Sequence, residues 1–224
     1  AVIGRKSRGV SGPGDLEGSV LGAPPPDGAW AQFPSFAKAN GIDISKVKVE
    51  PVGFPTREPM LAEGKVDSVT GFSFSSYLNL VRLGVPEEDI STILMADHGL
   101  KLYGNAVIVN TDYAKNNSDM VKKFLVAIGA GWRDAIKDPK AAAAALVKRN
   151  PAADAALEQR RLQLAIDANV LTDYVKANGM GGVDSSRFAA AIEQLSETYE
   201  YKAAPNAALY FTDEYLPASG ISLN

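Results

Sequence analysis

Residues 20–28 read VLGAPPPDG and join a predicted strand to a predicted helix. The apolar run at residues 20–23 favours a short buried strand, which the three prolines bring to an end. Asp27 then stands at a helix N-cap, because its carboxylate can accept a hydrogen bond from an N–H group of the first turn. The helix is predicted over residues 29–40, and Gly41 ends it.

The same alternation continues through the first half of the chain. Strands are predicted at residues 47–52, 66–72 and 91–96, and helices at residues 56–63 and from Ser73, a possible N-cap, to Gly84. Strands that alternate with helices across short connections are typical of a mostly parallel sheet with covering helices. One more strand is predicted at residues 103–110, and after it helices dominate.

The composition narrows the class of protein. The 224 residues are 46% hydrophobic and 22% charged, which is ordinary for a globular protein. The net charge is −3 and no Lys/Arg-rich tract is present, so a nucleic-acid partner is not expected. No apolar run reaches the roughly 18 residues that a membrane-spanning helix needs. The chain opens on a short apolar strand and not on a signal peptide, so we expect a mature, processed or truncated N-terminus.

Residues that carry catalysis or hold metals are scarce. The chain has no cysteine and one histidine, His98. The absence of cysteine excludes thiolate metal sites and cysteine nucleophiles, and the single histidine removes most histidine-based metal sites and weakens the case for a catalytic triad. The sequence contains neither a Gly-x-Ser-x-Gly elbow nor a phosphate-binding glycine pattern that follows a strand. We therefore predict no catalytic residue, no metal and no cofactor, and hence no enzyme.

Several short motifs occur in an order that resembles one family. They resemble those of the nitrate/sulfonate/taurine/thiamine-precursor group of solute-binding proteins, and the resemblance covers nearly the whole chain. The motifs are DLEG at residues 15–18, VLGAP at 20–24, ANGID at 39–43, GKVD at 64–67, LYGN at 102–105 and KRNP at 148–151.

The resemblance implies an α/β fold of the periplasmic-binding-protein type II class. This fold has a lobe with a parallel or mixed sheet and helices on both faces, here joined by a helix-rich, partial second lobe. Residues 1–10 and 103–224 would form the later portion of lobe 1, with its first part missing, and residues 11–102 would form lobe 2. A partial lobe exposes a sheet edge, so a homodimer or strand exchange is an additional expectation.

The function implied by the resemblance is solute capture without chemistry. The chain would be the periplasmic component of an ABC importer, holding a small anionic or heteroaromatic molecule in a cleft between the lobes and delivering it to a membrane permease. Two alternatives stay open. One is the effector-sensing domain of a LysR-type transcription regulator. The other is an enzyme similar to thiamine-pyrimidine-precursor synthases, which the absence of cysteine disfavours.

Candidate ligand contacts come from the loops that follow the strands. Ligands of open parallel sheets bind beyond the carboxyl ends of the strands, and helix N-termini there suit electron-rich groups. Arg57 could hold a carboxylate, sulfonate or phosphate through two hydrogen bonds, or be a solvated residue at a helix start. Trp30 could instead belong to the core, and Asn105 could serve a turn at the hinge. The predicted ligand-binding residues are Asp27, Gly28, Ala29, Trp30, Arg57, Gly71, Phe72, Ser73, Phe74, Tyr77, Tyr103 and Asn105.

Overall fold

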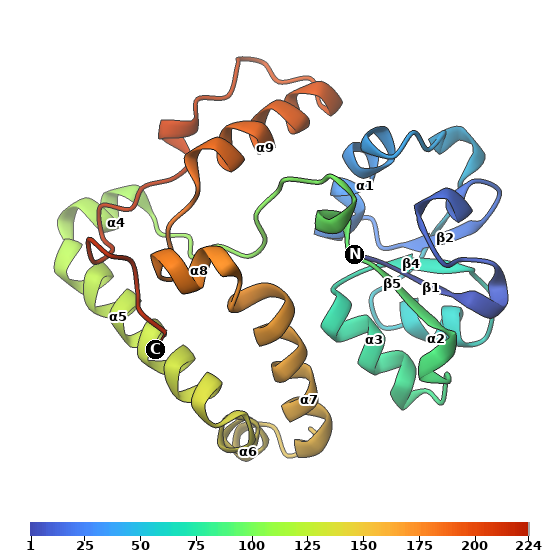
Figure 1. Ribbon diagram of the computed structural model, residues 1–224, viewed down its shortest axis with the longest axis horizontal. Coiled ribbons are helices and arrows are strands. Elements are labelled where there is room, and N and C mark those ends of the chain that lie inside the picture. Colours follow the sequence, from blue (N-terminus) through green and yellow to red (C-terminus); the bar gives the residue numbers. More distant parts are fainter. Residues whose placement is uncertain (224) are drawn as a thin grey trace. The chain divides into compact units, whose positions relative to one another are not determined.

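The computed structural model describes residues 1–223, which form two compact units (Figure 1). Unit 1 comprises Ala1–Leu102 and Arg187–Pro205, and unit 2 comprises Tyr103–Ser186 and the chain from Asn206 on. Unit 1 contains the sheet, whereas unit 2 is built from helices. The assignment of these segments to the two lobes of the family stays a prediction.

Unit 1 is organised around a five-stranded sheet in the order β3-β2-β4-β1-β5. The strands are β1 (Val2–Arg5), β2 (Val20–Ala23), β3 (Lys48–Pro51), β4 (Ser68–Thr70) and β5 (Ile90–Ile93). β2 is parallel to β3 and β4, as expected, but β1 runs antiparallel to β4 and β5. The sheet is therefore mixed. The helix-crossover rule constrains only strands joined by such a crossover, and β1 is followed by short 3-10 turns.

Helices cover both faces of the sheet. α1 (Gly28–Ala39) lies on one face, and α2 (Arg57–Ala62) and α3 (Ser73–Arg82) lie on the other (Figure 1). Successive residues of β1 point to opposite faces. Val2 accordingly joins the core that contains Phe33 and Phe36 of α1, and Ile3 joins the core that contains Leu61 and Leu80. The predicted fold of this half is thus formed, with element ends shifted by a few residues at most.

Charged side chains fasten the turn after β1 to the turn before β5. Arg5 Nε donates to Asp89 Oδ2 at 2.8 Å, and the Ser7 N–H donates to Asp89 Oδ1 at 2.6 Å. Burial raises the pKa of Asp89, but the hydrogen bonds from Ser7 and Arg5 outweigh it, and the pKa lies below its ordinary value. The ionised carboxylate therefore stabilises the outer edge of the sheet.

The last helix, α9 (Ser185–Thr198), packs onto unit 1 through side-chain hydrogen bonds. The Gln194 side chain accepts from the Lys101 N–H at 2.8 Å and donates to the Gly99 carbonyl oxygen at 2.7 Å. Thr198 Oγ1 accepts from Ser35 Oγ of α1 at 2.9 Å. A segment far along the chain is thus part of the unit that carries the sheet.

Unit 2 is helical, and its longest helix is amphipathic. Its helices are α4 (Thr111–Asn116), α5 (Ser118–Lys137), α6 (Pro139–Arg149), α7 (Ala155–Ala165) with a π-helical turn at Ile166–Val170, and α8 (Asp173–Asn178). Asp138 accepts a hydrogen bond from the Ala141 N–H at 2.9 Å and caps α6, whose first residue is Pro139.

The strand predicted at residues 103–110 is not formed. These residues carry no strand assignment, and the side chain of Ile108 is 91% exposed. A strand needs a neighbour to receive its N–H and C=O groups, and no strand among residues 1–223 pairs with this segment. The segment has strand-like apolar residues, but the described residues supply no strand to pair with it.

The C-terminal segment of unit 2 lies against α5 and the end of α8. Met180 and Ile221 form an isolated antiparallel bridge, and Arg133 Nη1 donates to the Ser222 carbonyl oxygen at 2.9 Å. Gly129 of α5 faces Ile221 so closely that a Cβ at this position would collide with the isoleucine side chain. The small residue thus lets the segment approach the helix.

Candidate functional site

The loops that follow β2, β3 and β4 meet at one edge of the sheet. These three strands are parallel neighbours, so their carboxyl ends lie on the same side. β2 leads to α1, β3 to α2 and β4 to α3. We call residues 27–30, 54–58 and 70–76 the rim. Nine of the twelve predicted ligand-binding residues belong to it.

Asp27 is the predicted N-cap of α1, and the structure confirms that role. Its Oδ1 accepts from the Ala29 N–H at 3.2 Å, and its Oδ2 accepts from the Thr70 hydroxyl at 2.7 Å. The side chain is almost fully buried. Asp27 therefore joins the helix start to the end of β4 and leaves a negative charge beneath the rim.

Arg57 is buried and paired with a carboxylate. The alternative that it is a solvated residue at a helix start is therefore wrong. Its Nε and Nη2 donate to Glu58 Oε1 at 3.0 and 2.7 Å, and Nη2 also lies 3.1 Å from Ser76 Oγ. Asp27 Oδ2 is 3.6 Å from Nη1. The guanidinium also lies over the ring of Phe54, 5.7 Å from its centroid. Two carboxylates thus share one buried cation.

Gly71 leaves the space that this cluster occupies. A Cβ at Gly71 would collide with Ser76 Oγ and would lie 3.1 Å from Arg57 Cζ. Its carbonyl oxygen accepts from the Ala1 amino group at 2.9 Å. Burial lowers the pKa of that amine to about 6, a shift that the nearby Asp27 carboxylate partly opposes.

Aromatic side chains border the buried cluster. Phe54 and Phe72 are 49% and 51% exposed, and Phe72 stacks on Phe74 with ring centroids 5.5 Å apart. Trp30 stacks on Phe33 and packs against the core, so it faces inward in part. Tyr77 donates its hydroxyl to Glu87 at 2.6 Å, which ties its hydroxyl to the turn before β5. Half-exposed phenylalanines are therefore the apolar surface that the rim offers.

The other predicted residues have simpler surroundings. Gly28, Ala29 and Ser73 lie in the first turns of α1 and α3. Ser73 is not the N-cap that we expected: Phe72 holds that position, and α3 begins without a side-chain cap. In unit 2, the Tyr103 hydroxyl accepts from the Asp184 N–H at 2.8 Å, and Asn105 is exposed. The ligand roles of all twelve residues stay predictions.

Sequence reasoning missed three polar members of the cluster. Glu58, Thr70 and Ser76 are buried, and each hydrogen-bonds to another buried polar side chain. Thr70 and Ser76 lay within a predicted strand and a predicted helix, and Glu58 was not among the predicted ligand-binding residues. The adjacent pair Arg57–Glu58 at the start of a helix was the available signal, because a buried cation requires a buried partner.

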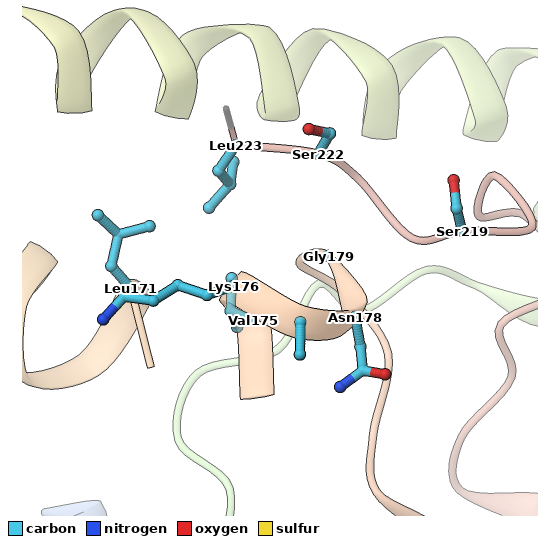
Figure 2. Close-up of a pocket in the computed structure, with 9 residues that line it drawn as sticks. Leu171, Val175, Lys176, Asn178, Gly179, Ser219, Ser222 and Leu223 are labelled. Atoms are coloured by element: carbon cyan, nitrogen blue, oxygen red, sulfur yellow. The ribbon is translucent and has the colours of Figure 1, made fainter. Parts of the chain in front are cut away.

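A hollow of about 180 Å³ lies in unit 2 between α8 and the C-terminal segment (Figure 2). Leu171, Val175 and Leu223 supply its apolar lining, and Lys176 and Asn178 its polar lining. Lys176 Nζ lies 3.5 Å from Asp173 Oδ1, so its charge is already matched. No sequence motif pointed to this place.

Two kinds of feature are absent from the described part of the chain. Among residues 1–223, no three His, Cys, Asp or Glu side chains come together in a way that could hold a metal ion. No helix in the same residues has both the length and the apolar character needed to cross a bilayer.

Known proteins share both the sequence pattern and the fold. The riboflavin-binding protein RibY of Chloroflexus aurantiacus is 25% identical over 209 residues, which cover 91% of this chain and 57% of RibY. The alkanesulfonate-binding protein SsuA of Xanthomonas axonopodis pv. citri, bound to MOPS, superposes with a TM-score of 0.63 at 14% identity, over 92% of this chain and 65% of that one. The periplasmic aliphatic sulphonate binding protein SsuA of Escherichia coli gives 0.65 at 11%, over 88% and 58%.

These likenesses confirm the fold class that the sequence predicted, a binding-protein fold with a mixed sheet and many helices. The chain spans 57% of the length of RibY and 58–65% of the two SsuA proteins. A family model described as NMT1/THI5 like matches residues 1–142, more than half of the chain. The chain belongs to the NMT1/THI5-like family, as its motifs indicated.

Proposed function

We propose that this chain is the solute-binding component of an ABC importer and works in the periplasm. The observation that carries the proposal is the rim of unit 1, where half-exposed aromatic rings border a buried arginine at the carboxyl ends of parallel strands. Open α/β sheets hold ligands at this edge. Membership of the NMT1/THI5-like family supports the same function, as does the similarity to RibY, a riboflavin-binding protein, and to SsuA, a sulphonate-binding protein.

The groups at the rim suit binding and not chemistry. The carboxylates of Asp27 and Glu58 are engaged by Thr70, Ser76 and Arg57, which leaves neither placed as a free general base. The hydroxyls of Thr70 and Ser76, which hydrogen-bond to these carboxylates, are fully buried, so neither is presented to a bound molecule as a nucleophile. The bound molecule would therefore leave unchanged, and delivery to a membrane permease would follow capture.

A panel of ligands tests this function directly. The full 224-residue chain is titrated by calorimetry with riboflavin, an aliphatic sulfonate and an aromatic carboxylate, and each ligand is then recovered and analysed by mass spectrometry. Binding of one ligand with complete recovery supports the proposal. Conversion of a ligand at enzymatic turnover, or no binding by any class, contradicts it.

A further inference from the structure

We infer that the rim selects an uncharged aromatic ring bearing a hydrogen-bond acceptor, and that Glu58 is the residue that disfavours anionic ligands. This inference rests on the proposed function and names the substrate class of the same site. It replaces the expectation that Arg57 grips a carboxylate or sulfonate. Three features of the buried cluster lead to it.

The first feature is the balance of charge. One guanidinium, that of Arg57, faces two carboxylates: Glu58 Oε1 at 2.7 Å and Asp27 Oδ2 at 3.6 Å. All three side chains are at least nine-tenths buried, so water screens them weakly. A ligand anion at this place would be a third negative charge beside a single cation.

The second feature is an unused donor. Nε and Nη2 of Arg57 both donate to Glu58, and Nη2 also contacts Ser76. Nη1 donates no hydrogen bond within residues 1–223, since Asp27 lies beyond hydrogen-bond distance. A carbonyl oxygen or a ring nitrogen can accept from Nη1 without adding charge. The Nε–Nη2 edge, through which a carboxylate or sulfonate could accept two parallel hydrogen bonds, is already occupied by Glu58 Oε1.

The third feature is the pair of exposed rings beside this donor. The Arg57 guanidinium lies over the ring of Phe54, and Phe72 follows Gly71, where an added Cβ would lie 3.1 Å from Arg57 Cζ. Each phenylalanine leaves about half of its surface open. Flat aromatic ligands stack favourably on such rings. Stacking surface next to a neutral-acceptor site matches a heterocycle that carries a carbonyl group.

Matched ligand pairs test the charge preference. We would measure dissociation constants on the full chain for nicotinamide against nicotinate and for benzenesulfonamide against benzenesulfonate, by ligand-observed NMR, with riboflavin as a larger neutral probe. The neutral member of each pair is expected to bind about tenfold more tightly or better. Equal or tighter binding of the anions overturns the inference while leaving solute binding intact. No binding by any probe overturns the proposed function and the inference with it.

A substitution assigns the preference to Glu58. Glu58→Gln keeps an oxygen that can accept from Arg57 and Ser76 but removes one negative charge. The preference for neutral over anionic ligands should fall by about tenfold. Glu63→Gln is the control, because it removes the same charge from a side chain that is 56% exposed. An unchanged preference in Glu58→Gln, or an equal change in Glu63→Gln, shows that Glu58 does not set the selectivity.

Discussion

Removal of the Glu58 carboxylate is expected to destabilise unit 1 strongly. Glu58 Oε1 accepts two hydrogen bonds from Arg57 and one, at 2.7 Å, from Ser76. Loss of one partner from a buried ion pair costs about 3–5 kcal/mol, because the other charge stays buried. Asp27 still lies 3.6 Å from Nη1 and offsets part of this cost. We therefore expect Glu58→Ala to lower the free energy of unfolding by about 3 kcal/mol.

The assay separates the two units through their tryptophans. Trp30 belongs to unit 1 and Trp132 to unit 2, so in a Trp132→Phe background the fluorescence reports on unit 1. Urea unfolding gives the free energy, and the melting temperature should fall by about 6–12 °C at about 2–4 °C per kcal/mol. Glu63→Ala is the exposed control. A loss below about 1 kcal/mol for Glu58→Ala, or one equal to the control, refutes the buried-cluster account.

Three further outcomes are expected. Ser68→Ala should leave the free energy of unfolding unchanged or raise it, because the buried Ser68 hydroxyl has no hydrogen-bond partner within residues 1–223. Ser91→Ala should lower the free energy of unfolding by about 1 kcal/mol, since the Ser91 hydroxyl donates to the Val10 carbonyl oxygen at 2.6 Å, and equal losses for the two variants in urea unfolding would contradict this. Gly129→Ala should destabilise unit 2 by about 1–3 kcal/mol by pushing Ile221 away, and a stabilised variant would contradict it. The pKa of Asp89 is lowered in the folded protein, so its ionised carboxylate stabilises the fold above the unfolded pKa of about 3.9, and this stabilisation is lost as the pH falls through the folded pKa. The difference in free energy of unfolding between the natural chain and Asp89→Asn should therefore shrink between about pH 5 and pH 3. A difference that does not vary with pH would contradict this.

The sequence predicted the local elements of unit 1 well and one feature of its topology poorly. The alternation of strand and helix from residue 20 to residue 96 is present, because proline, glycine and the N-cap Asp27 mark several ends of those elements. The antiparallel insertion of β1 was not predictable from periodicity, since pairing partners depend on contacts distant in the chain. The segment at residues 103–110 has strand-like residues, but a strand also needs a partner.

The sequence predicted where the candidate residues lie in the sheet, but not what surrounds them. The loops after the strands meet at one edge, since parallel strands place their carboxyl ends together, and ligand binding at that edge stays a prediction. The state of Arg57 could not be derived, because its burial depends on Ser76 and Asp27, which lie 19 and 30 positions away. Propensity also failed at Ser73, where the backbone places Phe72 at the cap.

The central claim is that the rim of unit 1 holds a small molecule, and amide NMR tests it directly. Gly28 and Gly71 lie in the rim, Gly53 directly precedes its middle segment, and Gly129 in unit 2 serves as the reference. Titration with riboflavin, or with whichever ligand binds in the calorimetric panel, should shift the amide signals of the three loop glycines together and leave Gly129 unchanged. Saturable binding that leaves all three loop glycines unshifted would contradict the account.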